Sequence, residues 1–242
     1  MNPRPHEKST RVLSELAKVF GVDVNSFDED KWSAAITAAG AIDTVVDVDH
    51  NYNSGYYFEQ VINGNSMPYM TDEEANFIRS TYEGLSDTSK KHWQTAASKL
   101  GAFALRRLQA TDIDEYLGVI VEESPLMANV LSIENDDSRH DHLQRKSYNT
   151  WMHPMIKSMF MFDTLTDVIK DYNEGNMSIP VTPKIVGKLG WCAVNEMVHL
   201  VRISPPSVFP IFLTRSVTKI REKTSKEGFW SSQFLRKNSL NM

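Results

Sequence analysis

The chain has 242 residues, of which 41% are hydrophobic and 24% are charged. This is an ordinary globular composition, which excludes disordered and collagen-like proteins. The formal net charge of −5 gives no general attraction to nucleic acid or to anionic lipid, so an anion-binding site would have to be local. Cys192 is the single cysteine, which excludes an intramolecular disulfide and a cysteine-based zinc site. We expect a cytoplasmic protein, because residues 1–10 lack the apolar core of a signal peptide and no apolar run reaches the roughly 18 residues of a membrane span.

Apolar residues at helical spacing dominate the first half of the chain. They predict helices over residues 8–20 and from Ser26 through Asp47, the second starting at a Ser26-x-x-Glu29 capping box. Residues 50–68 are rich in Asn, Gly and Tyr and predict a loop with at most a short helix. Further helices are predicted over residues 71–83, 86–108 and 111–131. Arg106 and Arg107 lie near the end of the 86–108 helix, where the helix dipole alone favours cations, so contact with a ligand is the less favoured interpretation there.

The second half of the chain continues the helical pattern. It predicts a long helix over residues 147–172, a helix over 182–201 that starts at Thr182-Pro183, and a last helix over 209–221. The polar tail from about residue 225 is expected to be flexible. No stretch alternates with period two, so the sequence predicts one all-α domain, a helical bundle, over residues 1–242.

Two helices carry aspartates at a spacing of four residues. Asp163, Asp167 and Asp171 recur within an apolar run, and Asp43 and Asp47 repeat the spacing in the second helix. Carboxylates four residues apart lie nearly above one another on a helix and destabilise it by a few tenths of a kcal/mol through repulsion. Two such helices facing each other would place several hard oxygen ligands around one cleft, which suits Mg²⁺ and a diphosphate. The competing interpretation is that both acidic faces are simply solvated.

Three segments resemble the squalene/phytoene synthase family of class I isoprenoid synthases. Asp43-Thr-Val-Val-Asp47 is similar to the first aspartate motif of that family, and Asp163-Thr-Leu-Thr-Asp167, continued to Ile179-Pro180, is similar to the second. The segment 111–131, with Asp114-Glu-Tyr116 near its start, falls where the family has its central helix. The resemblance in order and spacing covers residues from about 30 to 180.

The resemblance implies a fold, a cofactor and a substrate. It implies an all-α bundle of the class I isoprenoid synthase type, in which the aspartate motifs bind Mg²⁺ and the Mg²⁺ binds a prenyl diphosphate. The metal ligands expected from it are Asp43, Asp47, Asp163, Asp167 and Asp171, of which the first four are also expected to be catalytic. A carbocation formed on ionisation needs an apolar, water-free pocket. The side chains expected to form that pocket are Phe160 and Phe162, with Met159 and Trp151 beside them, and Lys170 and Arg215 are expected to complete substrate binding.

Several positions depart from the family pattern. The stretch Val119-Ile-Val-Glu122 replaces a small-residue pair and lacks the tyrosine of the central motif, while Thr166 and Lys170 replace an arginine and an acidic residue of the second aspartate motif. These departures favour a terpene synthase or cyclase that ionises one C10 to C20 prenyl diphosphate. Condensation of two prenyl diphosphates, as in squalene or phytoene synthases, is the first alternative. A catalytically silent binding or structural protein is the second, and a homodimer is left open.

Overall fold

The computed structural model describes residues 7–134, 141–208 and 210. These residues form eight α-helices and no strands, so the predicted all-α class is confirmed for the described part of the chain. Apart from residue 210, the predicted helix over residues 209–221 lies outside the described residues, as do Arg215 and the tail from residue 225. The helices are α1 (Glu7–Val19), α2 (Ser26–Asp49), α3 (Ser54–Ile62), α4 (Asp72–Glu83), α5 (Asp87–Gln109), α6 (Ile113–Leu131), α7 (His142–Glu174) and α8 (Pro183–Ile203).

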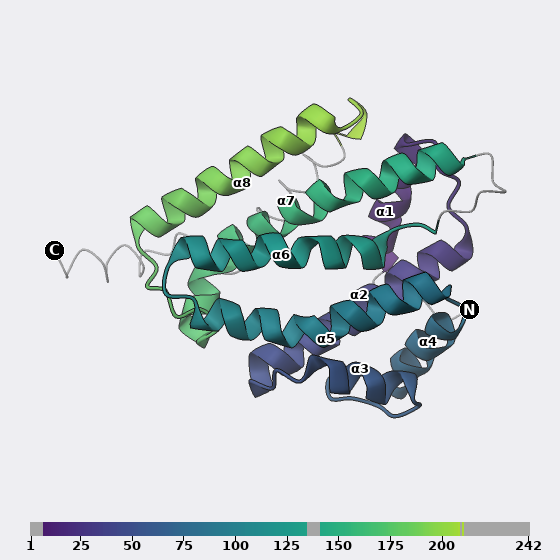
Figure 1. Ribbon diagram of the computed structural model, residues 1–242, viewed down its shortest axis with the longest axis horizontal. Helices are drawn as coiled ribbons and strands as arrows, with labels where there is room; N and C mark the ends of the chain where they lie inside the picture. Colours follow the sequence, from purple (N-terminus) through teal and green to yellow (C-terminus); the bar gives the residue numbers. More distant parts are fainter. Residues whose placement is uncertain (1–6, 135–140, 209, 211–242) are drawn as a thin grey trace.

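The later helices pack in the order of the chain. Figure 1 shows α5, α6, α7 and α8 as a series of neighbouring rods, and consecutive members of the series are in contact. Helix α2 contacts both α5 and α6, while α3 and α4 pack at one end against α5 and α2. Helices α2, α5, α6 and α7 are therefore the central elements, as expected for the two helices that carry the aspartates. None of the described helices is long and apolar enough to cross a membrane.

Capping side chains set most helix starts, and they differ in part from the sequence prediction. Asn25, rather than Ser26, caps α2: its side chain accepts a hydrogen bond from the Asp28 N–H at 2.9 Å and Asp28 completes the box. Thr71 begins α4 with a capping box in which Glu74 is its partner. Asp112 caps α6 by accepting from two backbone N–H groups. Asn and Asp satisfy the first N–H groups of a helix as well as Ser does, so neighbouring candidates cannot be separated by residue type.

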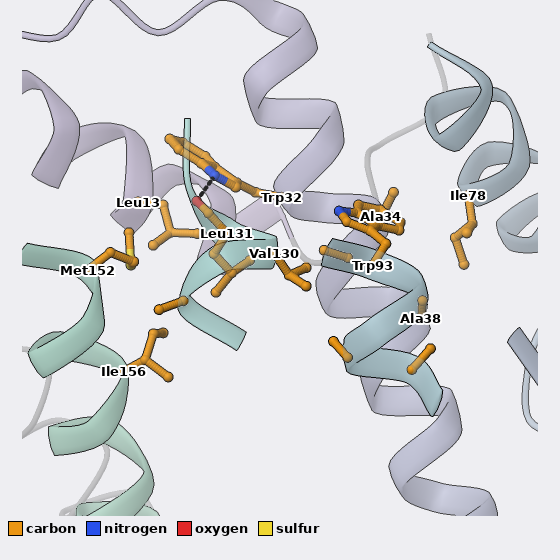
Figure 2. Close-up of a cluster of buried hydrophobic side chains, with 14 of the residues drawn as sticks. Leu13, Trp32, Ala34, Ala38, Ile78, Trp93, Val130, Leu131, Met152 and Ile156 are labelled. Atoms are coloured by element: carbon orange, nitrogen blue, oxygen red, sulfur yellow. Dashed lines mark hydrogen bonds between the residues drawn. The ribbon is translucent and has the colours of Figure 1, made fainter. Parts of the chain in front are cut away.

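The main hydrophobic core joins α1 through α7. Figure 2 shows Trp32 of α2 pointing between Leu13 of α1 and the end of α6, where its indole N–H donates to the Leu131 carbonyl at 2.6 Å. Trp32 is fully buried, and a buried indole N–H requires such a partner. This contact fixes the C-terminal end of α6 against α2.

A second apolar cluster joins α6, α7 and α8. It includes Tyr116 and Ile120 of α6, Val168 of α7, and Leu189 of α8. Phe160 of α7 packs against both clusters. The space beside Phe160, between the two clusters, holds the cavity described next.

Candidate functional site

A cavity of about 460 Å³ lies among the four central helices. Its charged and polar lining includes Asp43 and Asp47 of α2, Arg107 of α5, Tyr116 and Glu123 of α6, and Asp163, Asp167, Lys170 and Asp171 of α7. Its apolar lining includes Ile36, Ile42, Val46, Leu100, Ala104, Ile120, Met127, Leu131 and Phe160. The volume falls within the range of small-molecule sites, roughly 300 to 1,000 Å³.

The cavity has an acidic end and an apolar end. In α2, Ile36 precedes Asp43 by seven residues, or about 10 Å along the helix. Leu100 and Phe160 likewise precede the polar lining residues of α5 and α7, whereas Met127 follows those of α6, which runs the other way. The carboxylates therefore gather at one end, and the other end is closed by aliphatic and aromatic side chains.

The two aspartate helices face each other across the acidic end. Asp43 interacts electrostatically with Asp163, and Asp47 interacts with Asp171. Asp47 and Asp171 also lie in the last turns of their helices, where the helix dipole disfavours anions and favours cations. This end of the cavity is therefore built to attract positive charge.

The electrostatic cost of this arrangement appears in the pKa values of the aspartates. Burial in the cleft raises the pKa of Asp171 to about 7, with further contributions from Asp167 and Asp47. Burial and then the neighbouring Asp43 raise the pKa of Asp47 to about 6. The Asp43 side chain is exposed to the open space of the cavity. Its position deep within the cleft still removes water from around the carboxyl and raises its pKa, while Arg107 acts to lower it. A bound cation would relieve the repulsion between these groups.

Two basic side chains accompany the carboxylates. Lys170 is exposed at the rim, with its Nζ 3.9 Å from Glu174 Oε2. Arg107 is mostly buried and donates a hydrogen bond from one terminal nitrogen to Glu123. Burial lowers the pKa of Arg107, but Glu123, Tyr116 and the two aspartates of α2 outweigh burial and raise the pKa above its ordinary value. The guanidinium is therefore charged.

Most of the residues predicted from the sequence meet in this cavity. All five aspartates, Lys170 and Phe160 line it. Phe162, expected to form the apolar pocket, does not line it: its side chain packs in the second cluster. Trp151 is also not at the cavity but in the main core, where its indole N–H donates to Ser204 Oγ at 2.7 Å, and Met159 points to the surface. Residues three or four positions apart share one face of a helix, as Phe160 and Asp163 do. Met159, Phe162 and Trp151 lie one, two and nine positions from Phe160 and so face other neighbours, which explains these three corrections.

Three polar lining residues are not evident as site residues from the sequence. Ligand contact is the less favoured interpretation for Arg107 at its helix end, Glu123 matches no motif, and Tyr116 belongs to the segment that resembles the family's central helix. Burial raises the pKa of Tyr116 to about 12, so its hydroxyl is neutral. The signal that could have identified Arg107 is its pairing with Glu123 on the next helix, since α5 and α6 are joined by a short turn and must pack antiparallel.

The donor set fits a hard divalent cation that is shared with a ligand. Within residues 7–134, 141–208 and 210, no group of three or more His, Cys, Asp or Glu residues is arranged so that it could hold a metal ion unaided. Mg²⁺ does not need such a group, because it is usually bound by one or two carboxylates together with water and substrate phosphates. The oxygen ligands on opposite walls suit that mode of binding.

Comparison with known proteins gives the chain no assigned relatives. It matches no protein-family model, no curated protein and no solved structure. The likeness of its aspartate segments to the squalene/phytoene synthase motifs therefore remains a likeness of short, ordered segments.

Proposed function

We propose that this protein is a divergent class I terpene synthase or cyclase of the squalene/phytoene synthase-like type, which uses Mg²⁺ to ionise one prenyl diphosphate. The observation that carries the proposal is the facing of Asp43 and Asp47 with Asp163 and Asp171 at one end of a cavity whose other end is apolar. A prenyl diphosphate has the matching polarity, with a strongly anionic head and a hydrocarbon tail.

The size of the cavity favours one prenyl chain over two. At about 30 Å³ for each group of water's size, 460 Å³ holds roughly 15 such groups. Part of this volume is the acidic end, which would hold the diphosphate and the metal, so the remaining space suits one short prenyl chain and not two. The volume therefore supports single-substrate ionisation over condensation of two diphosphates.

Each part of the cavity has a role in the proposed reaction. The aspartates of both walls would hold Mg²⁺, which supplies Lewis-acid neutralisation of the diphosphate leaving group. Phe160, Ile42, Leu100 and Met127 exclude water from the apolar end, and the face of the Phe160 ring can stabilise positive charge on the hydrocarbon.

The test is incubation of the protein with C10, C15 and C20 prenyl diphosphates and Mg²⁺, followed by measurement of diphosphate release and of products. We expect release of diphosphate with one substrate and a product of the same carbon number. Products of doubled carbon number would instead establish the condensing enzyme. No release with any of the three substrates would refute both reactions and leave the binding-protein alternative.

Two variants and a matched control make the assay specific. Asp43→Asn and Asp163→Asn should each abolish turnover, because each removes a carboxylate from one wall. Asp72→Asn should retain full turnover, since Asp72 is exposed in the first turn of α4, away from the cavity lining. Full activity in either cavity variant would show that the metal assignment is wrong.

A further inference from the structure

Two adjacent arginines of α5 pair with two adjacent glutamates of α6 in very different surroundings. Arg106 makes a two-pronged contact with Glu122, at 2.6 and 3.1 Å, and both side chains are about half exposed (49% and 54%). Arg107 pairs with Glu123, and these side chains are only 22% and 6% exposed. The two pairs have the same residue types and the same separation in sequence, but one is on the surface and the other lines the cavity.

A contribution to the stability of the fold does not explain why the inner pair, Arg107 and Glu123, is charged. Removing two charges from water is costly, and replacing a buried ion pair by apolar side chains is often neutral or stabilising. An ion pair that serves only to join α5 and α6 is already supplied by Arg106 and Glu122. Arg107 is also the only arginine among the described residues that line the cavity. A functional role for the inner pair is therefore the better hypothesis.

The geometry of the inner pair leaves donors available. A guanidinium carries five N–H donors in a planar fork. Arg107 uses one terminal nitrogen for Glu123, and its other nitrogens make no hydrogen bond to any described residue. Arg106, in contrast, directs both terminal nitrogens to Glu122. Arg107 also lies close enough to Asp43 and Asp47 to interact with both electrostatically. The N–H groups that it does not use for Glu123 are therefore at the acidic end of the cavity.

We propose that Arg107 binds a phosphate oxygen of the ligand and that Glu123 is a positioning residue, which holds the guanidinium by one nitrogen so that the remaining donors face the ligand. This assignment rests on the proposed function, because it takes the ligand to be a diphosphate. A planar fork can make two parallel hydrogen bonds to a phosphate, which a lysine cannot. The pair would supply a fixed, metal-independent contact on the α5 and α6 side of the head group.

The test measures binding of inorganic pyrophosphate in the presence of Mg²⁺ by isothermal titration calorimetry. Arg107→Lys keeps the charge opposite Glu123 but removes the fork, and it should weaken pyrophosphate binding by about tenfold or more. Arg106→Lys is the matched control and should bind like the wild type. If the wild type binds pyrophosphate and Arg107→Lys binds it with the same affinity, this inference is overturned while the proposed function stays intact. Absence of pyrophosphate binding by the wild type would overturn both.

A second comparison tests Glu123 and does not depend on the folding of the arginine variant. Glu123→Gln and Glu123→Ala both remove a negative charge from the cavity, but only glutamine keeps an acceptor for Arg107. We expect Glu123→Ala to bind pyrophosphate about tenfold more weakly than Glu123→Gln, a difference that loss of the charge alone cannot produce. Equal affinities would show that Glu123 does not position Arg107.

Discussion

The raised pKa of Asp171 makes a specific prediction about how stability depends on pH. Ligand-free folded protein holds the Asp171 proton up to about pH 7, whereas the unfolded chain releases it near the ordinary value of 3.8. Between these values the folded state binds more protons than the unfolded state. The free energy of unfolding contributed by this group therefore falls as the pH rises through that window. The side chain introduced by Asp171→Asn cannot ionise. The variant should therefore be more stable than the wild type above about pH 7 and equally stable below pH 3.8.

The size of the effect follows from the same values. The difference between 3.8 and about 7 corresponds to about 4 kcal/mol for a fully shielded group. The side chain is only partly buried on the cavity wall, and screening by solvent reduces the expected gain to about 1 to 2 kcal/mol. For a chain of this length, each kcal/mol shifts the melting temperature by roughly 2 to 4 °C. We therefore expect Asp171→Asn to melt about 2 to 8 °C higher at pH 8, with less than half of that difference remaining at pH 5, inside the window.

The assay is thermal unfolding followed by circular dichroism between pH 5 and pH 8, with a chelator present so that no divalent cation binds. The control is Glu83→Gln, because Glu83 is an exposed carboxylate at the end of α4 and its removal should not change the pH dependence. If Asp171→Asn and the wild type lost stability in parallel as the pH rose, the electrostatic account of the acidic end would be wrong.

Two further predictions concern the apolar end and its support. Leu100 and Met127 separate the cavity from a hollow of about 30 Å³ that they also line. Leu100→Ala should join the two spaces and shift turnover toward longer prenyl chains, at a cost of about 1 to 3 kcal/mol in stability because the side chain is only partly buried. An unchanged ratio of C20 to C15 turnover would contradict this. A Cβ at Gly101 would lie 1.9 Å from the Tyr52 carbonyl oxygen, whereas one at Gly118 would meet nothing within 4 Å. In urea unfolding, Gly101→Ala should therefore lose at least about 1 to 3 kcal/mol and Gly118→Ala should gain up to about 1 kcal/mol; equal effects of the two would refute the close approach.

The parts of the site that the sequence predicted are those that depend on one helix at a time. The stacking of Asp163, Asp167 and Asp171 follows from helix geometry alone, and the apolar residues around the aspartates of α2 correctly indicated a central helix. What the sequence did not predict depends on how two helices pack. One step of about 100° between Arg106 and Arg107 decides which of them enters the cavity, and no local pattern reveals the facing surface of α6. The same reason explains Phe162, which is two positions from Phe160 but faces the second cluster.

The charge balance of the cavity constrains the order in which its ligands can bind. Six carboxyl groups and two basic side chains line it: Asp43, Asp47, Asp163, Asp167, Asp171 and Glu123 against Arg107 and Lys170. A diphosphate alone would enter a field of its own sign, so it should bind weakly without cations. Cations that enter first, or together with it, relieve repulsion among the aspartates and also attract the head group. Because such coupling is reciprocal, the diphosphate must raise the affinity for Mg²⁺ by the same factor by which Mg²⁺ raises the affinity for the diphosphate. Paired titrations, each ligand in the absence and presence of the other, would therefore measure one coupling free energy from both sides, and this coupling should be strongly favourable if the aspartates of α2 and α7 bind the metal.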